Sequence, residues 1–347
     1  MIEIAGRKIG PDQPPYIVCE LSGNHNGSLD RALALVDAAA ATGCDAIKIQ
    51  TYTADTITLD SDAPDFLVKG GLWDGMSLHA LYQLASTPYE WHPALFERAA
   101  KLGVTMFSTP FDDTAVDLLE SLNAPAYKIA SFEVVDLPLV ARVARCKKPM
   151  IISTGMANEA EMAEVVDTAL SNGAAGVVLL HCTSSYPAPM DSANVRNVPM
   201  LAERFGVVGG LSDHTMGTAA SVAAVALGAC LIEKHFTLAR ADGGPDADFS
   251  LEPAEFSALV RDCKDAWSAV GTAGFERAGV EVGNIKFRRS LYVTADVKAG
   301  EALTPANVRS VRPGHGLPPK VLPEVLGRRA ARDLSYGEPL AWDMLAE

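Results

Sequence analysis

Eight short apolar runs, each followed by a segment with helical periodicity, constrain the fold of this chain more than any other feature. The runs occupy residues 16–20, 45–50, 104–109, 124–131, 149–154, 176–182, 206–212 and 230–236. Strands that alternate with helices form parallel sheets, because each helix returns the chain to the edge where the next strand starts. Eight such units within roughly 270 residues predict a (β/α)₈ barrel of the TIM type. A doubly wound sheet is the alternative, but eight equal units without a Gly-rich fingerprint disfavour it.

The chain changes character after this alternation ends. We predict a barrel domain over 1–272, a polar linker over 273–286 and a small domain over 287–347 that is rich in Arg, Gly and Pro. About 60 residues is near the lower limit for independent folding, so we expect the small domain to dock on a barrel. Within the barrel, the segment 51–86 with its GGLWDG motif (70–75) is longer than a strand-to-helix loop needs, which predicts a functional insertion or lid.

Composition excludes several classes of function. Apolar residues make up 48% of the 347 residues, and the net charge of −14 argues against nucleic-acid binding, which needs clustered Lys and Arg. The six cysteines include no C-x-x-C pair, which indicates reduced core residues rather than a disulfide framework. No apolar signal segment or membrane-spanning run is visible. We therefore expect a cytoplasmic protein that binds neither nucleic acid nor membrane.

Two histidines follow neighbouring strands of the predicted barrel. His214 lies in the motif GLSDHT, and His235 lies in EKHF. Because neighbouring parallel strands end at the same face of a barrel, the two imidazoles should emerge side by side, with Asp213 and Glu233 nearby. Such a donor set can hold a divalent metal. Unrelated polar residues at loop starts are the alternative, since histidine is often structural.

Two lysines lie within apolar strands, where an unpaired ammonium group is costly. Lys48 and Lys128 need anionic partners inside a barrel, unless they are surface residues of misassigned strands. Together with hydroxyl groups at other strand ends they predict a phosphate site. Glu20 and Glu133 either pair with these lysines or are free for acid–base and hydroxyl-positioning work. The residues together fit a metal-assisted aldol-type reaction of a phosphorylated compound.

Motifs along nearly the whole chain resemble those of the nonulosonic (sialic) acid synthase family. They are, in order, ELSGNHNGS, KIQTY, FSTPFD, YKIASFE, STGM, GLSDHT, EKHF, and RRSLYV with RPGHGLPPK. The resemblance implies a (β/α)₈ barrel followed by a small antifreeze-like (SAF, β-clip) domain. It also implies condensation of phosphoenolpyruvate with an N-acetylated amino sugar, using Mn²⁺ or Mg²⁺. The resemblance further implies a domain-swapped homodimer, in which the small domain of one subunit covers the barrel of the other.

The resemblance implies roles for individual residues as well. His214 and His235 would be the metal ligands, and Glu20 would lie beside the metal and the aldehyde or attacking water. Residues implied to hold the phosphate and carboxylate of phosphoenolpyruvate are Lys48, Thr109, Lys128, Ser131, Ser153 and Ser212. Residues implied to face the sugar are Gln50, Glu133, Tyr186, Asp246 and, from the small domain of the other subunit, Arg312. Ser184 stands where the N-acetylneuraminate branch commonly has Asn, so its phosphate contact departs from the pattern.

Within the family, four segments resemble the pseudaminic acid branch. They are YKIASFE with Phe132, FRRSLYV, GGLWDG and RPGHGLPPK, whereas the sialic and legionaminic branches usually read YKIGSGE. The bulky apolar Phe132 would suit a 6-deoxy sugar with two acetamido groups, and the implied acceptor is 2,4-diacetamido-2,4,6-trideoxy-L-altrose. The alternatives are an N-acetylneuraminate or legionaminic acid synthase, a metal-dependent pyruvate aldolase or lyase, and a non-catalytic sugar-binding role for the small domain.

Overall fold

The chain folds into two compact units, Met1–Gly271 and Thr272–Glu347, each with its own hydrophobic core. The computed structural model describes residues 1–70 and 73–346. Across these residues, none of the helices combines the length and the apolar character that crossing a membrane requires.

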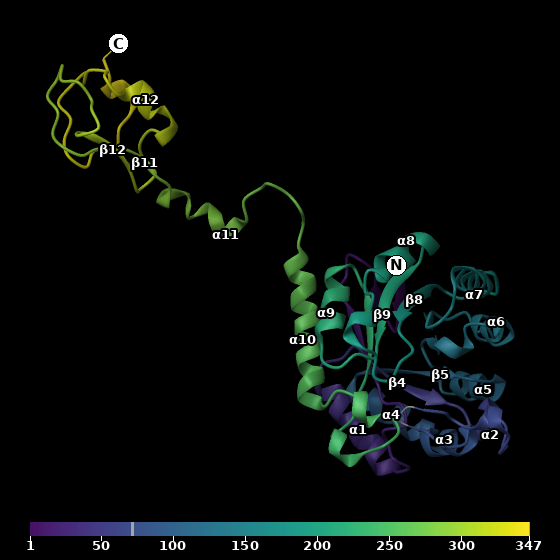
Figure 1. Ribbon diagram of the computed structural model, residues 1–347. Helices are drawn as coiled ribbons and strands as arrows, with labels where there is room; N and C mark the ends of the chain where they lie inside the picture. The colour runs from purple at the N-terminus through teal and green to yellow at the C-terminus, as the bar shows by residue number, and fades with distance from the viewer. Residues whose placement is uncertain (71–72, 347) are drawn as a thin grey trace. The chain divides into compact units, whose positions relative to one another are not determined.

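Eight parallel strands of the first unit close into a barrel (Figure 1), so the predicted (β/α)₈ fold is confirmed. The strands are β3 (Tyr16–Glu20), β4 (Ala46–Thr51), β5 (Thr105–Pro110), β6 (Tyr127–Ile129), β7 (Met150–Ser153), β8 (Val177–Cys182), β9 (Val208–Asp213) and β10 (Leu231–His235). They follow one another around the ring in sequence order, and β10 closes it by pairing with both β9 and β3. This register places His235 directly beside Glu20.

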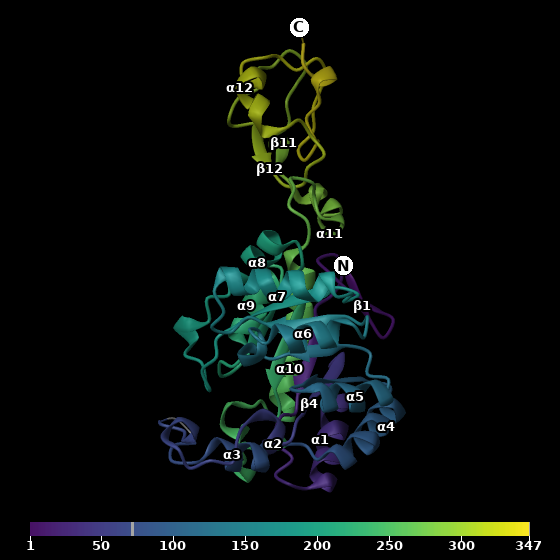
Figure 2. The same cartoon turned by 90° about the vertical axis from the view of Figure 1, so that its right-hand side faces the viewer.

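Helices lie around the outside of the barrel, one after each of its strands (Figure 2). They are α1 (Leu29–Ala41), α4 (His92–Leu102), α5 (Asp113–Ser121), α6 (Leu137–Ala144), α7 (Glu159–Ser171), α8 (Asn197–Phe205), α9 (Ala219–Ala226) and α10 (Pro253–Val270). Local sequence sets their ends. Ser28 caps α1 by accepting a hydrogen bond from the Arg31 amide, and Gly103 ends α4 in the left-handed conformation.

A small hairpin precedes the barrel and supplies apolar residues to one end of it. It pairs β1 (Ile2–Ile4) with β2 (Arg7–Ile9). Ile2, Ile4 and Ile9 share one buried cluster with Val18 and Phe107 of the barrel strands. Burying apolar surface stabilises the fold by roughly 25 cal/mol per Å². The amino-terminal end of the barrel therefore serves stability, and the carboxyl end is left for polar chemistry.

The predicted insertion between β4 and α4 has secondary structure of its own. It contains α2 (Ala54–Ile57) and α3 (Leu78–Ala85), and Leu67 forms an isolated bridge with Ser77. Gly71 and Leu72 of the GGLWDG motif lie outside the described residues, whereas the rest of the motif is described.

Short 3₁₀ turns complete the connections. They are η1 (Pro64–Phe66), η2 (Tyr89–Trp91), η3 (Ser131–Glu133), η4 (Met190–Ser192), η5 (Arg240–Asp242), η6 (Ala247–Phe249), η7 (Ile285–Phe287), η8 (Pro319–Val321) and η9 (Trp342–Met344). One of them corrects an expectation. The run 124–131 forms a strand only over β6, because the chain turns into η3, which begins at Ser131 and includes Glu133.

The second unit pairs two antiparallel strands, β11 (Ser290–Val293) and β12 (Val308–Val311). Its short helices are α11 (Gly279–Val282) and α12 (Leu322–Val325). Leu291, Val308 and Leu340 belong to its buried cluster. The stretch 273–286, expected as a linker, thus includes the helical turn α11.

Candidate active site

Four ionisable side chains from different strands meet inside the carboxyl end of the barrel; we call Glu20, Lys48, Lys128 and Glu233 the charge centre. Lys48 Nζ lies 2.9 Å from Glu20 Oε2 and 3.4 Å from Glu233 Oε1. Lys128 Nζ donates to both carboxylate oxygens of Glu233, at 2.8 and 2.9 Å. All four side chains are buried, which is tolerable only because each charge has a partner. Both lysines are therefore interior residues and not surface residues of misassigned strands.

Burial and pairing act in opposite directions on the pKa values of the charge centre. Burial raises the pKa of Glu233, but Lys128 and Lys48 outweigh it and lower this pKa to about 2. Burial also raises the pKa of Glu20, and there the attraction of Lys48 does not offset it. Glu233 is thus firmly ionised, while Glu20 binds a proton more readily. Because Glu20 is less firmly ionised than Glu233, the two ammonium groups can accept a further anion.

Hydroxyl groups lie around the charge centre. Thr109 Oγ1 accepts a hydrogen bond from Lys48 Nζ at 3.2 Å, and Ser184 Oγ donates to Ser131 Oγ at 3.1 Å. Ser153 Oγ is buried and has no hydrogen-bond partner among the described residues. A Cβ atom at Gly155, where φ is +51°, would lie 2.3 Å from the Ser131 Cβ, so only glycine fits beside these hydroxyls. We call the hydroxyl groups of Thr109, Ser131, Ser153 and Ser184 the cradle. Hydroxyl groups can donate hydrogen bonds to the oxygen atoms of an anion.

The two histidines predicted as metal ligands lie side by side, with ring centroids 5.4 Å apart. His214 Nδ1 is 3.1 Å from the Thr183 carbonyl oxygen. Its Nδ1–H therefore donates to that carbonyl and Nε2 keeps a lone pair. His235 Nδ1 is buried and has no partner among the described residues. Burial, followed by the neighbouring cations, lowers the pKa of His235 well below its ordinary value, so its imidazole is neutral and able to ligate.

A divalent metal fits this pair of imidazoles. No group of three or more His, Cys, Asp or Glu side chains in the described part of the chain is arranged to hold a metal ion. Two protein ligands leave coordination positions for water or substrate, as a catalytic metal requires. The unpartnered nitrogen of His235 and the fixed tautomer of His214 are both consistent with such a site.

Asp213 lies outside the site, which corrects the expectation that it stands near the metal. Its carboxylate is 2.8 Å from Lys234 Nζ and accepts a hydrogen bond from Ser221 of α9 at 2.6 Å. Side chains alternate along a strand, so Asp213 and Lys234 face the helix layer while Ser212 and Glu233 face the interior. Glu233, in turn, pairs with the lysines of the charge centre.

A cavity of about 420 Å³ lies at the mouth of the barrel. Gln50 Nε2–H donates to Glu20 Oε1 at 2.9 Å, and Asp246 accepts a hydrogen bond from the Ser22 hydroxyl. Burial raises the pKa of Glu133 to about 7, and its Oε2 has no partner among the described residues. Of the predicted site residues, those lining the cavity are Gln50, Glu133, Ser184, Tyr186, His235 and Asp246.

Arg312 belongs to the second unit and lies on its exposed RPGHG loop. Ser290 Oγ–H donates to the Pro313 carbonyl at 2.7 Å and accepts from the Gly316 amide at 2.9 Å. A Cβ atom at Gly316 would lie 2.2 Å from the Leu291 carbonyl oxygen, so glycine is required there. The motifs RRSLYV and RPGHGLPPK therefore fold against each other and hold the loop in place.

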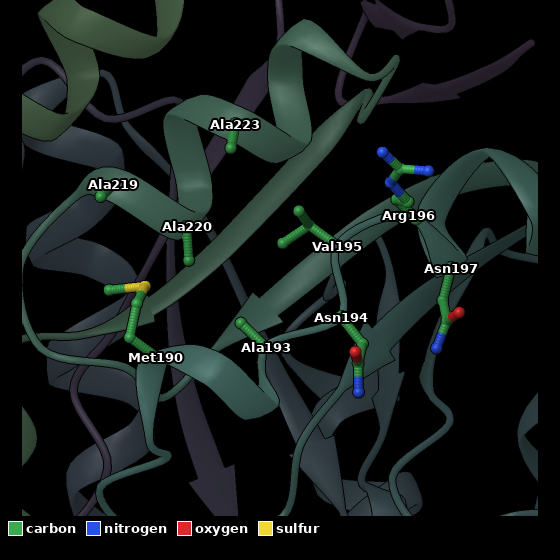
Figure 3. Close-up of a pocket in the computed structure, with 9 residues that line it drawn as sticks. All are labelled: Met190, Ala193, Asn194, Val195, Arg196, Asn197, Ala219, Ala220 and Ala223. Carbon is green, nitrogen blue, oxygen red and sulfur yellow. The ribbon is translucent and has the colours of Figure 1, made fainter.

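A larger hollow of about 680 Å³ lies on the outside of the barrel beside α8 and α9 (Figure 3). Ala219 and Ala223 of α9 border it, together with Met190 and Val195. Among its lining residues Arg196 alone is ionisable. Binding sites need several convergent polar groups, so the cavity at the barrel mouth is the better candidate for chemistry.

Besides Phe111, which follows β5, three aromatic residues of the cavity lining were missed in the sequence: Tyr52, Trp73 and Tyr82. All three belong to the segment 51–86, whose length predicted a functional insertion. Length alone does not show which side chains of an insertion turn toward a site, because that depends on how the insertion folds.

The closed barrel, with paired lysines and paired histidines at one mouth, defines a (β/α)₈ protein equipped for chemistry on an anionic substrate. The family model for the NeuB family matches residues 35–274, and that for the SAF domain matches residues 288–346. The chain belongs to the NeuB family and carries a SAF domain, so the resemblance inferred from its motifs is confirmed.

Individual relatives match over nearly their full lengths. Pseudaminic acid synthase of Campylobacter jejuni is 45% identical over 329 residues, which cover 95% of this chain and 96% of that protein. Pseudaminic acid synthase of Helicobacter pylori is 43% identical, covering 95% and 98%. The solved structure of N-acetylneuraminic acid synthetase from Leptospira borgpetersenii, in complex with citrate, is 30% identical with a TM-score of 0.73, covering 82% of this chain and 94% of that chain. The chain is therefore an enzyme of the synthase type.

Proposed function

We propose that this chain acts as a pseudaminic acid synthase, condensing phosphoenolpyruvate with 2,4-diacetamido-2,4,6-trideoxy-L-altrose to give pseudaminic acid and phosphate. The observation that carries the proposal is the convergence of the charge centre, the cradle and the histidine pair at one barrel mouth. A substrate with both a phosphate and a carboxylate needs fixed cations and donors, and an aldehyde acceptor needs polarisation. The identity to two pseudaminic acid synthases supports the choice of branch.

Phosphoenolpyruvate is assigned to the charge centre and the cradle. An ammonium group has three donors, so Lys48 and Lys128 can keep their contacts with Glu233 and still donate to a phosphate oxygen. The residues proposed to complete the contacts to phosphate and carboxylate are Thr109, Ser131, Ser153, Ser184 and Ser212. The 3.1 Å hydrogen bond between Ser184 and Ser131 supports a cradle role for Ser184, although the N-acetylneuraminate branch commonly has Asn there.

The NeuB family is metal-dependent in general, and we assign Mn²⁺ or Mg²⁺ to His214 and His235. Bound there, the metal would supply Lewis-acid polarisation of the open-chain sugar aldehyde. The protein's own contribution is to orient both imidazoles and to keep that of His235 neutral. The Thr183 carbonyl fixes the tautomer of His214, and burial keeps His235 deprotonated.

The reaction forms one carbon–carbon bond and breaks one carbon–oxygen bond. The vinyl carbon of phosphoenolpyruvate attacks the aldehyde carbon, and the aldehyde oxygen takes up a proton. Water adds to the cationic C2 while Glu20, held by Lys48 and Gln50, accepts its proton. The tetrahedral intermediate then collapses: its C2–O bond to phosphate breaks, the hydroxyl proton passes to the departing phosphate, and a keto group is left. Lys48 and Lys128 stabilise the charge on the departing phosphate.

The sugar is assigned to the cavity, where Gln50, Glu133, Tyr186 and Asp246 present polar groups. We further propose a domain-swapped homodimer, in which Arg312 of one subunit reaches the acetamido group of the sugar bound to the other. Phe132 lines the same cavity and is 61% exposed, which supports its proposed contact with a 6-deoxy sugar. A cytoplasmic location belongs to the proposal, because all six cysteines are free.

Phosphoenolpyruvate labelled with ¹⁸O at its bridging oxygen tests the function and the bond that breaks. With metal and the diacetamido sugar, we expect all released phosphate to carry the label, with one keto-acid product formed per phosphate. Chelation and His235→Ala should each abolish both products. Label retained in the sugar acid, or phosphate released without any sugar, contradicts the proposal. Product formed from pyruvate without phosphate release identifies an aldolase or lyase instead.

A further inference from the structure

The cavity at the barrel mouth has two chemically different faces. One face carries polar groups from the barrel and its loops, namely those of Ser22, Gln50, Glu133, Ser184, His235 and Asp246. The other face is largely apolar and comes mostly from the insertion between β4 and α4. It contains an aromatic wall, which we define as Tyr52, Trp73, Tyr82 and Phe111.

The aromatic wall is packed and fixed in place. The Tyr52 ring meets the rings of Tyr82 and Phe111 edge-on, with centroids 5.8 and 5.0 Å apart. Trp73 stands beside Tyr186 at 6.2 Å, and its indole N–H donates to the Pro245 carbonyl at 3.1 Å. That bond ties the insertion to the loop after β10. The wall is therefore a preformed surface of the cavity.

Two phenol groups of the wall are available to a ligand. Neither Tyr52 nor Tyr82 has a side-chain hydrogen bond to another described residue, and both line the cavity. Burial raises the pKa of both phenols, and the charge of Glu133 raises that of Tyr82 further. Both hydroxyls are therefore protonated donors near neutral pH. The wall thus offers aromatic surface beside two O–H donors.

This combination matches an acylamino group better than a hydroxylated carbon. An acetamide has a carbonyl acceptor next to a methyl group, so one side of it can accept from a phenol while the other packs on a ring. A sugar carbon that carries only hydroxyls would lose its hydrogen bonds to water against aromatic carbon without replacing them. A methyl substituent makes no hydrogen bonds to water, so its burial on the same aromatic surface is favourable.

We propose that the aromatic wall is the specificity subsite for the acetamido and methyl substituents remote from the aldehyde, so that it selects diacetamido, deoxy acceptors over polyhydroxylated ones. This inference rests on the proposed function. It assigns recognition of these substituents to the insertion, whereas the catalytic groups lie on the barrel strands. Tyr52 and Tyr82 donate to the acetamide carbonyl, while Phe111 and Trp73 contact its methyl group and the C6 methyl.

The test compares steady-state kinetics of three full-length variants. In Tyr52→Phe/Tyr82→Phe only the two donors are lost, so the KM for the diacetamido sugar should rise about tenfold, while kcat and the KM for phosphoenolpyruvate stay unchanged. In Tyr82→Gln the wall becomes more polar, so the preference for the diacetamido sugar over N-acetylmannosamine should fall. Tyr16→Phe is the matched control, since Tyr16 is a buried phenol without a hydrogen-bond partner in the described chain and lies outside the cavity lining.

The outcomes distinguish failure of the proposed function from failure of the proposed subsite. If the unaltered enzyme releases no phosphate with the diacetamido sugar, the proposed function fails. If it does, but the double variant has the same sugar KM as Tyr16→Phe, the subsite is wrong and the function stands. A fall in kcat at constant sugar KM also overturns the subsite, because a binding surface for remote substituents acts first on affinity.

Discussion

Glu233 is the residue on which both buried lysines depend. Its carboxylate lies within 3.4 Å of Lys48 and 2.8 Å of Lys128. Glu233→Gln leaves Lys128 without its ion-pair partner, and removing one partner of a buried pair costs about 3–5 kcal/mol. We expect the free energy of unfolding, measured with urea, to fall by that amount. Glu159→Gln breaks the exposed pair with Arg204 and should cost less than about 1 kcal/mol; equal losses in the two variants would contradict the role of the charge centre.

Glu133 gives the stability a pH dependence of a defined sign. Burial raises its pKa to about 7, above the ordinary value of an unfolded chain. Between about pH 5 and pH 7 the folded state therefore holds a proton that the unfolded state has lost, so this residue makes stability fall as the pH rises, by up to about 1.4 kcal/mol per pH unit. In Glu133→Gln this contribution should vanish, and unfolding curves of both proteins across that range measure it. A slope that is the same in both proteins would refute the assigned pKa.

At the scale of elements, the periodic pattern of the sequence was enough to predict the barrel. Seven of the eight predicted runs differ from the observed strands by at most two residues at either end, because buried parallel strands are apolar throughout. The fourth run, 124–131, was overextended at both ends, and its last residue, Ser131, already begins the turn η3. Local composition does not show that turn, which is what directs Glu133 into the cavity.

The sequence predicted the parts of the site that lie at the ends of adjacent strands, but not the contacts across the barrel interior. The proximity of His214 and His235 was predictable, because the carboxyl ends of adjacent strands in a parallel barrel lie side by side. The pairing of Glu233 with Lys128 joins residues far apart in the sequence, and no spacing rule reveals a contact across the barrel interior. Tyr52 and Tyr82 became visible as cavity residues only once the insertion had a structure.

Gly210 tests how tightly neighbouring strands approach each other. A Cβ atom at this position of β9 would lie 2.4 Å from the Leu231 carbonyl oxygen of β10. Gly210→Ala should therefore destabilise the barrel by about 3 kcal/mol, as overpacking of a core does, measured as a lower Tm and urea midpoint. Gly279→Ala is the control, because nothing lies within 4 Å of a Cβ atom there. If both variants unfold at the same urea concentration, the close approach of β9 and β10 is not real.

At the scale of the whole molecule, the central question is whether Arg312 acts on its own barrel or on that of a second subunit. Arg312→Ala should raise the KM for the sugar far more than that for phosphoenolpyruvate, and His235→Ala should be inactive. If dimers exchange subunits, a mixture of the two contains mixed dimers with one complete site each. We expect about a quarter of the unaltered activity to return at low sugar concentration. If no activity returns after verified subunit exchange, Arg312 acts within its own subunit.

Phosphate release measured with three acceptor sugars decides which sugar this enzyme condenses with phosphoenolpyruvate. The enzyme, loaded with Mn²⁺ and given phosphoenolpyruvate, is offered separately 2,4-diacetamido-2,4,6-trideoxy-L-altrose, the legionaminic precursor and N-acetylmannosamine. We predict turnover with the first sugar and negligible release with the other two. Turnover only with one of the others would retain the family and the mechanism but contradict the pseudaminic assignment. If folded, metal-loaded enzyme releases phosphate with none of the three sugars, both the assigned acceptor and the proposed synthase reaction are contradicted.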